Sequence, residues 1–140
     1  MPKAIDTSLY RVIDANLNRL KEGIRVIEDI ARYVYNDREL ASKLKELRHQ
    51  SRIDDLQNLL NSRDSVNDVL RPTVSSEMNR DSLEGIIIAN YKRAQESSRV
   101  LEELYKIVQP ELSENFKSLR YALYQLEKEN LSVDQVSKSE

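Results

Sequence analysis

The stretch ANLNRLKEGIRVIED, residues 15–29, decides the fold, because a second version of it, ANYKRAQESSRVLEE, stands at residues 89–103. Helix ends further along also correspond, with LKELRH at 44–49 and FKSLRY at 116–121. When residues 13–34 are aligned with 87–108, a shift of 74, nine residues are identical: Ile13, Ala15, Asn16, Arg19, Glu22, Arg25, Val26, Glu28 and Val34. The repeated unit is therefore a helical hairpin, and two stacked hairpins predict an all-α four-helix bundle.

The composition limits the class of protein. A chain of 140 residues fits one domain, and its two glycines and three prolines favour long helices. The absence of cysteine excludes disulfides and thiolate metal sites and favours a cytoplasmic protein. The net charge of -2 argues against a nucleic-acid partner, and no segment has the apolar length that a membrane requires. We expect a cytoplasmic homodimer.

Apolar residues at positions 13, 17, 20, 24, 27, 31 and 34 step by four and three, which predicts a first helix beginning near Asp6 or Thr7. Asn36, with Glu39 three residues later, is predicted to cap a second helix that reaches about Asn61. A loop at 62–80, a third helix to about Val108 and a fourth from Pro110 to about Asn130 complete the pattern. The predicted domain therefore covers residues 1–130, with repeats at about 8–61 and 81–129, and residues 131–140 form a disordered tail.

Four repeated polar residues fall inside the combined apolar arcs of the first and third helices on a helical wheel: Asn16, Arg19, Asn90 and Arg93. One interpretation is that Glu22 and Glu96, three residues after each arginine, neutralise it and fix the helix register. Because buried charges seldom repay their desolvation, a ligand that needs guanidinium groups explains the pattern better. Arginine suits phosphate oxygens, and asparagine can bind the edge of a ring.

Other kinds of site fit poorly. Glu46 and His49 form a Glu-x-x-His pair, but a di-iron bundle needs two such pairs and the chain has one histidine. A Ser-His-Asp triad built on His49 lacks an oxyanion turn, and no glycine-rich phosphate loop is present. A phosphate site must therefore use side chains and helix ends, and His49 beside Arg48 is placed to face an anion.

The segments YRVIDANLNRLKEGIRVIEDIARYV, LRH, SRDSVNDV and ANYKRAQESSRVLEELYKIV together resemble a small helical family, the monofunctional hydroxymethylpyrimidine phosphate kinases of thiamin biosynthesis. Members of that family also form the N-terminal part of fusions with thiamin phosphate synthase. The resemblance spans roughly residues 8–128 and implies conversion of hydroxymethylpyrimidine phosphate to the diphosphate with ATP and Mg²⁺, in the stand-alone form. The chain departs from the pattern at Leu70, where glycine is expected, and at Ser97 and Ser98, which replace small apolar residues.

Phosphoryl transfer needs positioning and charge neutralisation, which arginines, a metal ion and one carboxylate near the acceptor can supply. The candidate phosphate-binding residues are Arg19, Arg25, Arg93, Arg99, Arg48, His49 and Arg63. Asn16 and Asn90 are candidates for binding a ring or ribose. Asp64 and Asp68 are candidate Mg²⁺ ligands on a loop that closes as a lid, and Glu22, Glu96, Asp64 and Asp68 are the candidate catalytic carboxylates.

Two functions of other classes stay open. One is a helical binding or dimerisation module that senses a phosphorylated metabolite without turning it over. The other is a purely structural bundle.

Overall fold

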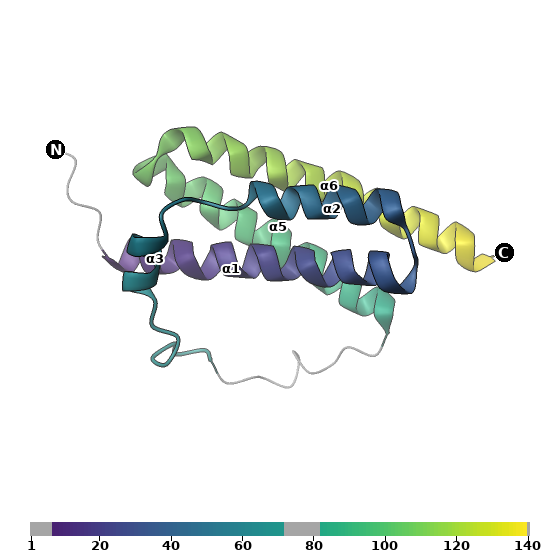
Figure 1. Ribbon diagram of the computed structural model, residues 1–140, viewed down its shortest axis with the longest axis horizontal. Helices are drawn as coiled ribbons and strands as arrows, with labels where there is room; N and C mark the ends of the chain where they lie inside the picture. Colours follow the sequence, from purple (N-terminus) through teal and green to yellow (C-terminus); the bar gives the residue numbers. More distant parts are fainter. Residues whose placement is uncertain (1–6, 72–81, 140) are drawn as a thin grey trace.

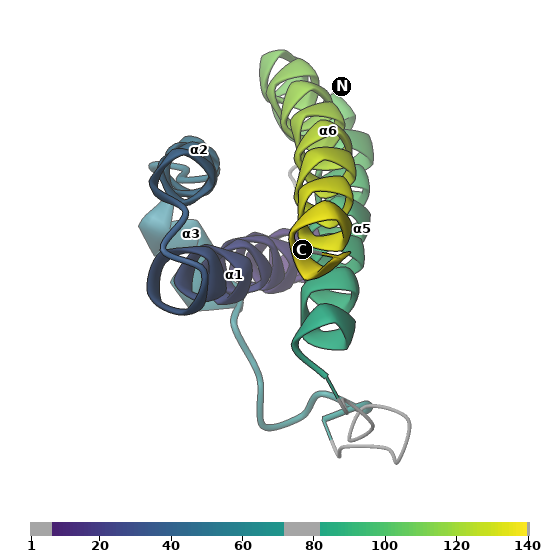
Figure 2. The same cartoon turned by 90° about the vertical axis from the view of Figure 1, so that its right-hand side faces the viewer.

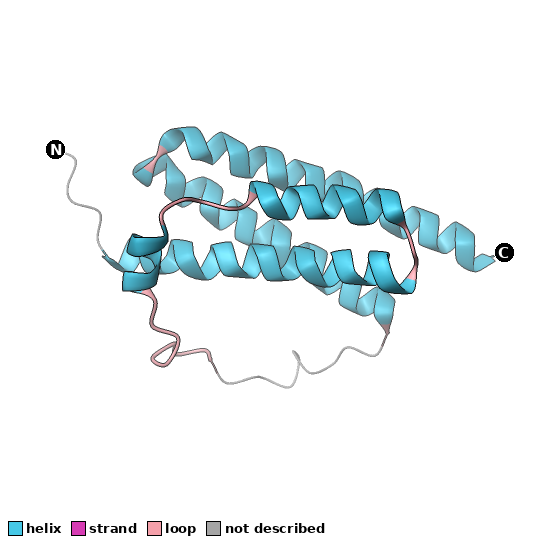
Figure 3. Cartoon of the chain, in the orientation of Figure 1, coloured by secondary structure: helices cyan, strands magenta, loops and turns pink. Residues whose placement is uncertain are grey.

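The computed structural model describes residues 7–71 and 82–139, and these contain helices and loops but no strand (Figures 1 and 3). The all-α prediction is confirmed. The elements in chain order are α1 (Thr7–Asp29), the π-helical turn η1 (Ile30–Val34), α2 (Arg38–Gln50), α3 (Leu56–Ser62), α5 (Leu83–Val108) and α6 (Pro110–Ser139). None of the helices in the described ranges combines the length and the apolar character of a membrane span.

The four long helices form two hairpins, as the repeat predicts. Helix α2 packs on α1, α6 packs on α5, and the hairpins meet through α1 and α5, while α2 and α6 have little contact. The end-on view shows α2 beside α1 and α6 in front of α5, with α2 and α6 well apart (Figure 2). The two central helices approach closely at Gly23, where an added Cβ would lie 3.2 Å from the carbonyl oxygen of Asn90. Because α2 and α6 hardly touch, the bundle is open on one side. The short helix α3 packs on α1 as well.

The core follows the predicted seam of α1. Ile13, Leu20, Ile24 and Ile27 are 0–1% exposed, whereas Val34 at the end of the seam is 51% exposed. On the second hairpin the core includes Tyr105 and Phe116, whose rings stack with centroids 5.4 Å apart. Burial of this stripe is the main force that joins the hairpins.

The connection between α1 and α2 differs from the prediction. Asp37, not Asn36, caps α2 by accepting a 3.1 Å hydrogen bond from the backbone N–H of Leu40. Asn36 has a φ of 53°, in the left-handed region that asparagine tolerates better than most residues. Before it, α1 widens into η1, so the chain turns through a broad loop.

The predicted second helix, ending near Asn61, is wrong. Helix α2 ends at Gln50, because the Ser51 hydroxyl donates a 2.6 Å hydrogen bond to the carbonyl oxygen of Arg48 and competes with helix continuation. The chain then forms the separate short helix α3, which packs on α1.

At the other hairpin, Pro110 begins α6 and Ser82 caps α5 through the N–H of Gly85. Helix α6 continues to Ser139, past the predicted end near Asn130 and through the segment predicted to be disordered. That segment is polar, but it contains no glycine or proline, so nothing in it breaks a helix already begun. Part of the predicted loop 62–80, residues 72–80, lies outside the described residues.

Candidate functional site

A pocket of about 480 Å³ lies between the N-terminal half of α1 and the loop that follows α3. We call it the α1 pocket. Its charged and polar lining includes residues of both elements: Arg11, Asp14, Asn16, Arg19, Arg63, Asp64 and Asp68. Five of the predicted site residues, Asn16, Arg19, Arg63, Asp64 and Asp68, therefore come together. Its volume falls in the range of small-molecule sites.

The loop is attached to α1 by two arginine contacts. Arg63 donates two hydrogen bonds, of 2.8 and 2.7 Å, to the carboxylate of Asp14, which is 5% exposed. These hydrogen bonds raise the pKa of the Arg63 guanidinium. One turn earlier on α1, Arg11 donates a 3.1 Å hydrogen bond to the carbonyl oxygen of Asp64. Asp14 and Arg11 thus fix the wall of the pocket, and sequence reasoning missed both because their partners lie about fifty residues away.

The carboxylate of Asp64 is held by its own loop. It accepts hydrogen bonds from the side-chain amide of Asn67 at 2.7 Å and from the Asn67 backbone N–H at 3.2 Å. These two bonds lower the pKa of Asp64, so the group is ionised at neutral pH. Asp68 accepts a 3.0 Å hydrogen bond from the N–H of Leu70. Both carboxylates belong to the lining of the pocket.

Asn16 is buried, as its position in the apolar arc predicts. Its Nδ2 donates a 2.9 Å hydrogen bond to the carbonyl oxygen of Val12, and Asn90 makes the equivalent bond of 2.8 Å to Ile86. Asn16 Oδ1 accepts no hydrogen bond from the described residues. Every fully buried side-chain oxygen among these residues has a hydrogen-bond partner, so Oδ1 is not fully buried. Because Asn16 lines the pocket, this oxygen is accessible from it. The repeat therefore preserves the internal hydrogen bond of both asparagines, and of the two only Asn16 lines the α1 pocket.

The expected burial of Arg19 is wrong. Arg19 and Arg93 are both exposed, because the second apolar arc of α1 is only partly covered and its Val12 and Val26 are 42% and 36% exposed. Arg19 lines the α1 pocket, whereas Asn90 and Arg93 do not. The two halves of the repeat thus differ, since the loop after α3 completes a pocket only on α1.

The other predicted residues lie away from this pocket. Arg25 pairs with Asp29 at 3.2 Å, and its repeat equivalent Arg99 pairs with Glu103 at 3.4 Å, both along one helix face. His49 is exposed on α2.

The alternative interpretation, in which each arginine is neutralised by the glutamate three residues later, is not observed. Among the described residues, Glu22 and Glu96 are exposed and form no ion pair with Arg19 or Arg93. Neither glutamate lines the α1 pocket, so the structure does not bring these candidate bases to it.

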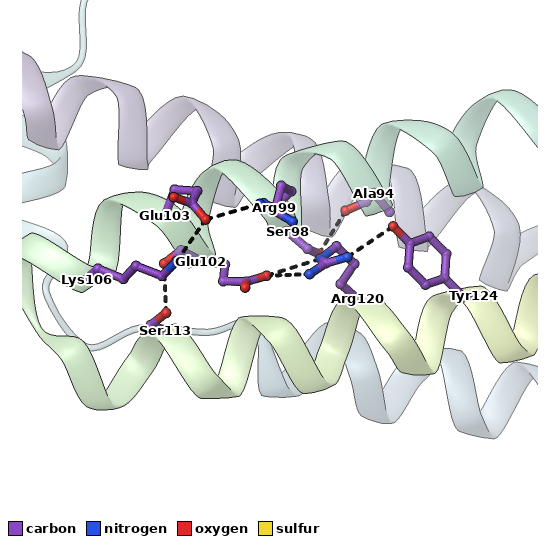
Figure 4. A network of polar contacts seen from close by, with 9 residues as sticks. All are labelled: Ala94, Ser98, Arg99, Glu102, Glu103, Lys106, Ser113, Arg120 and Tyr124. Atoms are coloured by element: carbon purple, nitrogen blue, oxygen red, sulfur yellow. Dashed lines mark hydrogen bonds and ion pairs between the residues drawn. The ribbon is translucent and has the colours of Figure 1, made fainter.

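The buried charges of the repeat are Glu28 and Glu102 instead. Arg48 donates to Glu28 at 2.7 and 3.2 Å, and Arg120 donates to Glu102 at 2.8 and 3.1 Å, so each hairpin is joined by one arginine–glutamate pair (Figure 4 shows the second). Hydrogen bonding to Glu28 raises the pKa of Arg48, and bonds to the Tyr124 hydroxyl and Glu102 raise that of Arg120. Arg48 is therefore occupied within its hairpin. The shared Leu-Arg of LKELRH and FKSLRY, taken with the repeated glutamates, was the sequence signal for these pairs.

The described residues contain no group of three or more acidic or histidine side chains close enough to hold a metal ion by themselves. Mg²⁺ commonly uses one or two carboxylates and takes its other ligands from water and substrate phosphates. Asp64 and Asp68 fit that limited role, because both line the pocket. Asp68 Oδ2 accepts no hydrogen bond from the described residues, and each oxygen of Asp64 accepts only one, which leaves it a second lone pair.

Comparison with known proteins gives the relatives of this chain. The sequence model of the ThiD2 family matches residues 11–129. The thiamine-phosphate synthase of Synechocystis sp. is 38% identical over 128 residues, which cover 91% of this chain and 37% of the relative. The thiamine-phosphate synthase of Nostoc sp. (strain PCC 7120) is 36% identical over 129 residues, which cover 89% of this chain and 36% of the relative.

The chain spans little more than a third of the length of these curated relatives. No solved structure matches it. Because the family match covers all but the two ends of the sequence, the chain belongs to the ThiD2 family.

Proposed function

We propose that this chain is an ATP-dependent kinase of thiamin biosynthesis that converts hydroxymethylpyrimidine phosphate to the diphosphate. The observation that carries the proposal is the α1 pocket, whose lining brings together Arg11, Arg19 and Arg63 with Asp64 and Asp68. The family membership and the name thiamine-phosphate synthase of the relatives support the pathway. The kinase step follows from the sequence resemblance described above.

The charges of the pocket suit a metal-bound nucleotide better than a free anion. Three arginines face three aspartates, since Asp14 joins Asp64 and Asp68, so the side chains sum to about zero. A bare polyphosphate gains little net attraction from such a set. ATP would supply the phosphoryl group, and its Mg²⁺ ion would supply the missing positive charge. Asp64 and Asp68 are the residues that would hold the metal.

The residues of the pocket then have separate tasks. Arg19 has no ion-pair partner among the described residues and is free to bind a phosphate, whereas Arg63 is oriented by Asp14 and presents its exposed edge. Asn16 Oδ1 accepts from an amino group of the pyrimidine. The acceptor is a phosphate oxygen, which is largely ionised at neutral pH, so catalysis needs charge neutralisation and alignment more than a general base. The distance of Glu22 and Glu96 from the pocket is therefore no obstacle.

The test is a coupled assay for ADP release with hydroxymethylpyrimidine phosphate as acceptor. Arg19→Gln should lower kcat/KM at least tenfold, about 1.4 kcal/mol of transition-state stabilisation, while Arg93→Gln, its repeat equivalent outside the pocket, should leave it unchanged. Asp64→Asn and Asp68→Asn should lower turnover by a similar factor across a Mg²⁺ titration. Equal effects of the Arg19 and Arg93 variants would contradict the assignment of the pocket.

The acceptor also tests the proposal. The unphosphorylated pyrimidine alcohol should react far more slowly than its phosphate, because the arginines that bind the phosphate are left unpaired. If calorimetry detects binding of hydroxymethylpyrimidine phosphate but no ADP is released, the chain is a sensing module and not a kinase.

A further inference from the structure

A second pocket, of about 290 Å³, lies at the other end of α1, where the first hairpin turns. We call it the hairpin pocket, and its lining includes Glu28, Arg32, Asn36, Arg38, Ser42 and Lys45. In Figure 1 the turn between α1 and α2 lies at the opposite end of α1 from α3. Sixteen residues of helix separate Asn16 from Arg32, about 24 Å, so this pocket is distinct from the α1 pocket.

The lining of the hairpin pocket is positively charged. Arg32 comes from η1, and Arg38 and Lys45 come from α2, two turns apart on one side of that helix. In residues 7–71 and 82–139, no acidic side chain forms an ion pair with any of these three cations. The acidic residue in the lining, Glu28, is already neutralised by Arg48 at 2.7 Å. Three cations thus share one concave surface without a counter-charge.

The second hairpin provides an internal comparison. The repeat shift is 74 before the turn and 72 after it, as residues 44–49 and 116–121 show, so the first connection is two residues longer. At the shift of 72, Ala41 corresponds to Ser113, whose hydroxyl donates a 2.8 Å hydrogen bond to the carbonyl oxygen of Glu102 and ties the second turn (Figure 4). Ala41 cannot make that bond. The first turn is therefore longer and lacks this side-chain bond.

The two hairpins also differ in the charged residues at their turns. Arg38 corresponds to Pro110, so the second hairpin lacks that cation. Lys106, which corresponds to Arg32 at the shift of 74, is neutralised by Glu103 at 2.9 Å. The two hairpins keep the same buried arginine–glutamate pair, so hairpin stability does not require the basic cluster. Lys45 is retained as Lys117, but its two companions are replaced or neutralised, so the cluster of three unpaired cations is found on the first hairpin only among the described residues.

We propose that the hairpin pocket is a second anion site that binds diphosphate, free or as the terminal group of a small metabolite. Guanidinium groups bind phosphate oxygens through paired donors, and Lys45 adds a point charge. The pocket lies at the longer turn, and Ser42 and Asn36 add neutral donors to its lining. Diphosphate is preferred over monophosphate because three cations can be matched by its larger charge. The proposal does not rest on the kinase activity.

The test is a titration of the full chain with inorganic diphosphate at low ionic strength, followed by the backbone amide signals of residues 36–45 in NMR spectra. The Arg38→Gln/Lys45→Gln variant should weaken the dissociation constant obtained from these signals at least tenfold. Lys117→Gln, the repeat equivalent of Lys45 in the second hairpin, should change it less than twofold. Far-UV circular dichroism checks that each variant keeps its helices.

A parallel titration with inorganic phosphate should give weaker binding at the same signals, and one with ADP tests whether a terminal diphosphate group is accepted. Arg63→Gln in the α1 pocket should leave the constant unchanged, even if it abolishes the kinase reaction. Unshifted amides in the unaltered chain, or a double variant that binds as tightly as that chain, would overturn the proposal.

Discussion

The contact between Asp14 and Arg63 should stabilise the fold as well as shape the α1 pocket, and its two ends should respond unequally to mutation. The Asp14 side chain is 7% exposed and the Arg63 side chain is 44% exposed, with nitrogen–oxygen distances of 2.7 and 2.8 Å. Arg63→Gln leaves a buried carboxylate without its counter-charge. Asp14→Asn leaves an arginine that can turn into water.

The magnitudes follow from the burial of each end. Breaking a fully buried ion pair from one side costs roughly 3–5 kcal/mol, and exposed pairs contribute at most about 1 kcal/mol. Because water reaches the Arg63 end, we expect about 2 kcal/mol for Arg63→Gln and about 1 kcal/mol for Asp14→Asn. The coupling free energy between the two sites should be at least about 1 kcal/mol.

The assay is urea unfolding of the two single variants and the double variant, followed by far-UV circular dichroism. Arg19→Gln is the matched control, since it lines the same pocket without an ion pair and should change the free energy of unfolding by less than about 0.5 kcal/mol. A coupling below about 0.5 kcal/mol, or a larger loss for Asp14→Asn than for Arg63→Gln, would refute this reasoning.

Three further predictions concern the core. Glu102→Gln should lower the free energy of unfolding by about 3 kcal/mol in urea titrations, because both Glu102 and Arg120 are 9% exposed; a loss below about 1 kcal/mol would contradict this. Burial raises the pKa of Tyr105 from 10.0 to about 12. The neutral phenol therefore contributes to the free energy of unfolding in full below pH 10, and this contribution, roughly 2–3 kcal/mol, is lost as the pH rises through about 12. Tyr105→Phe should remove this alkaline loss from unfolding curves measured between pH 9 and 12, and an unchanged loss would exclude Tyr105 as its source. Gly23→Ala should lower stability by about 1 kcal/mol, despite the better helix propensity of alanine, because the new methyl would lie 3.2 Å from the Asn90 carbonyl oxygen; a higher melting temperature would refute it.

Part of the candidate site could be predicted from the sequence. Asn16 and Arg19 repeat at Asn90 and Arg93, and this anomaly directed attention to the N-terminal half of α1, where the pocket lies. The sequence could not tell which repeat carries the pocket, since that depends on the loop after α3 folding back on α1. Arg63 was a candidate for binding phosphate, but its anchor Asp14 was not identified, because a contact across 49 positions has no local pattern.

The sequence by itself determined the helical class, the repeated hairpin, the apolar seam of α1 and the start of α6 at Pro110. These features depend on residues within one or two turns of each other, where spacing, capping and the missing proline N–H act directly. Only the tertiary structure decided which repeated charges are buried. The wheel placed Arg19 inside the apolar arc, yet the charge that is buried is Glu28, because α2 brings Arg48 over that position while the face that carries Arg19 stays partly uncovered. Burial of a charge depends on the partner that a neighbouring helix supplies, and that partner is set by how the helices cross.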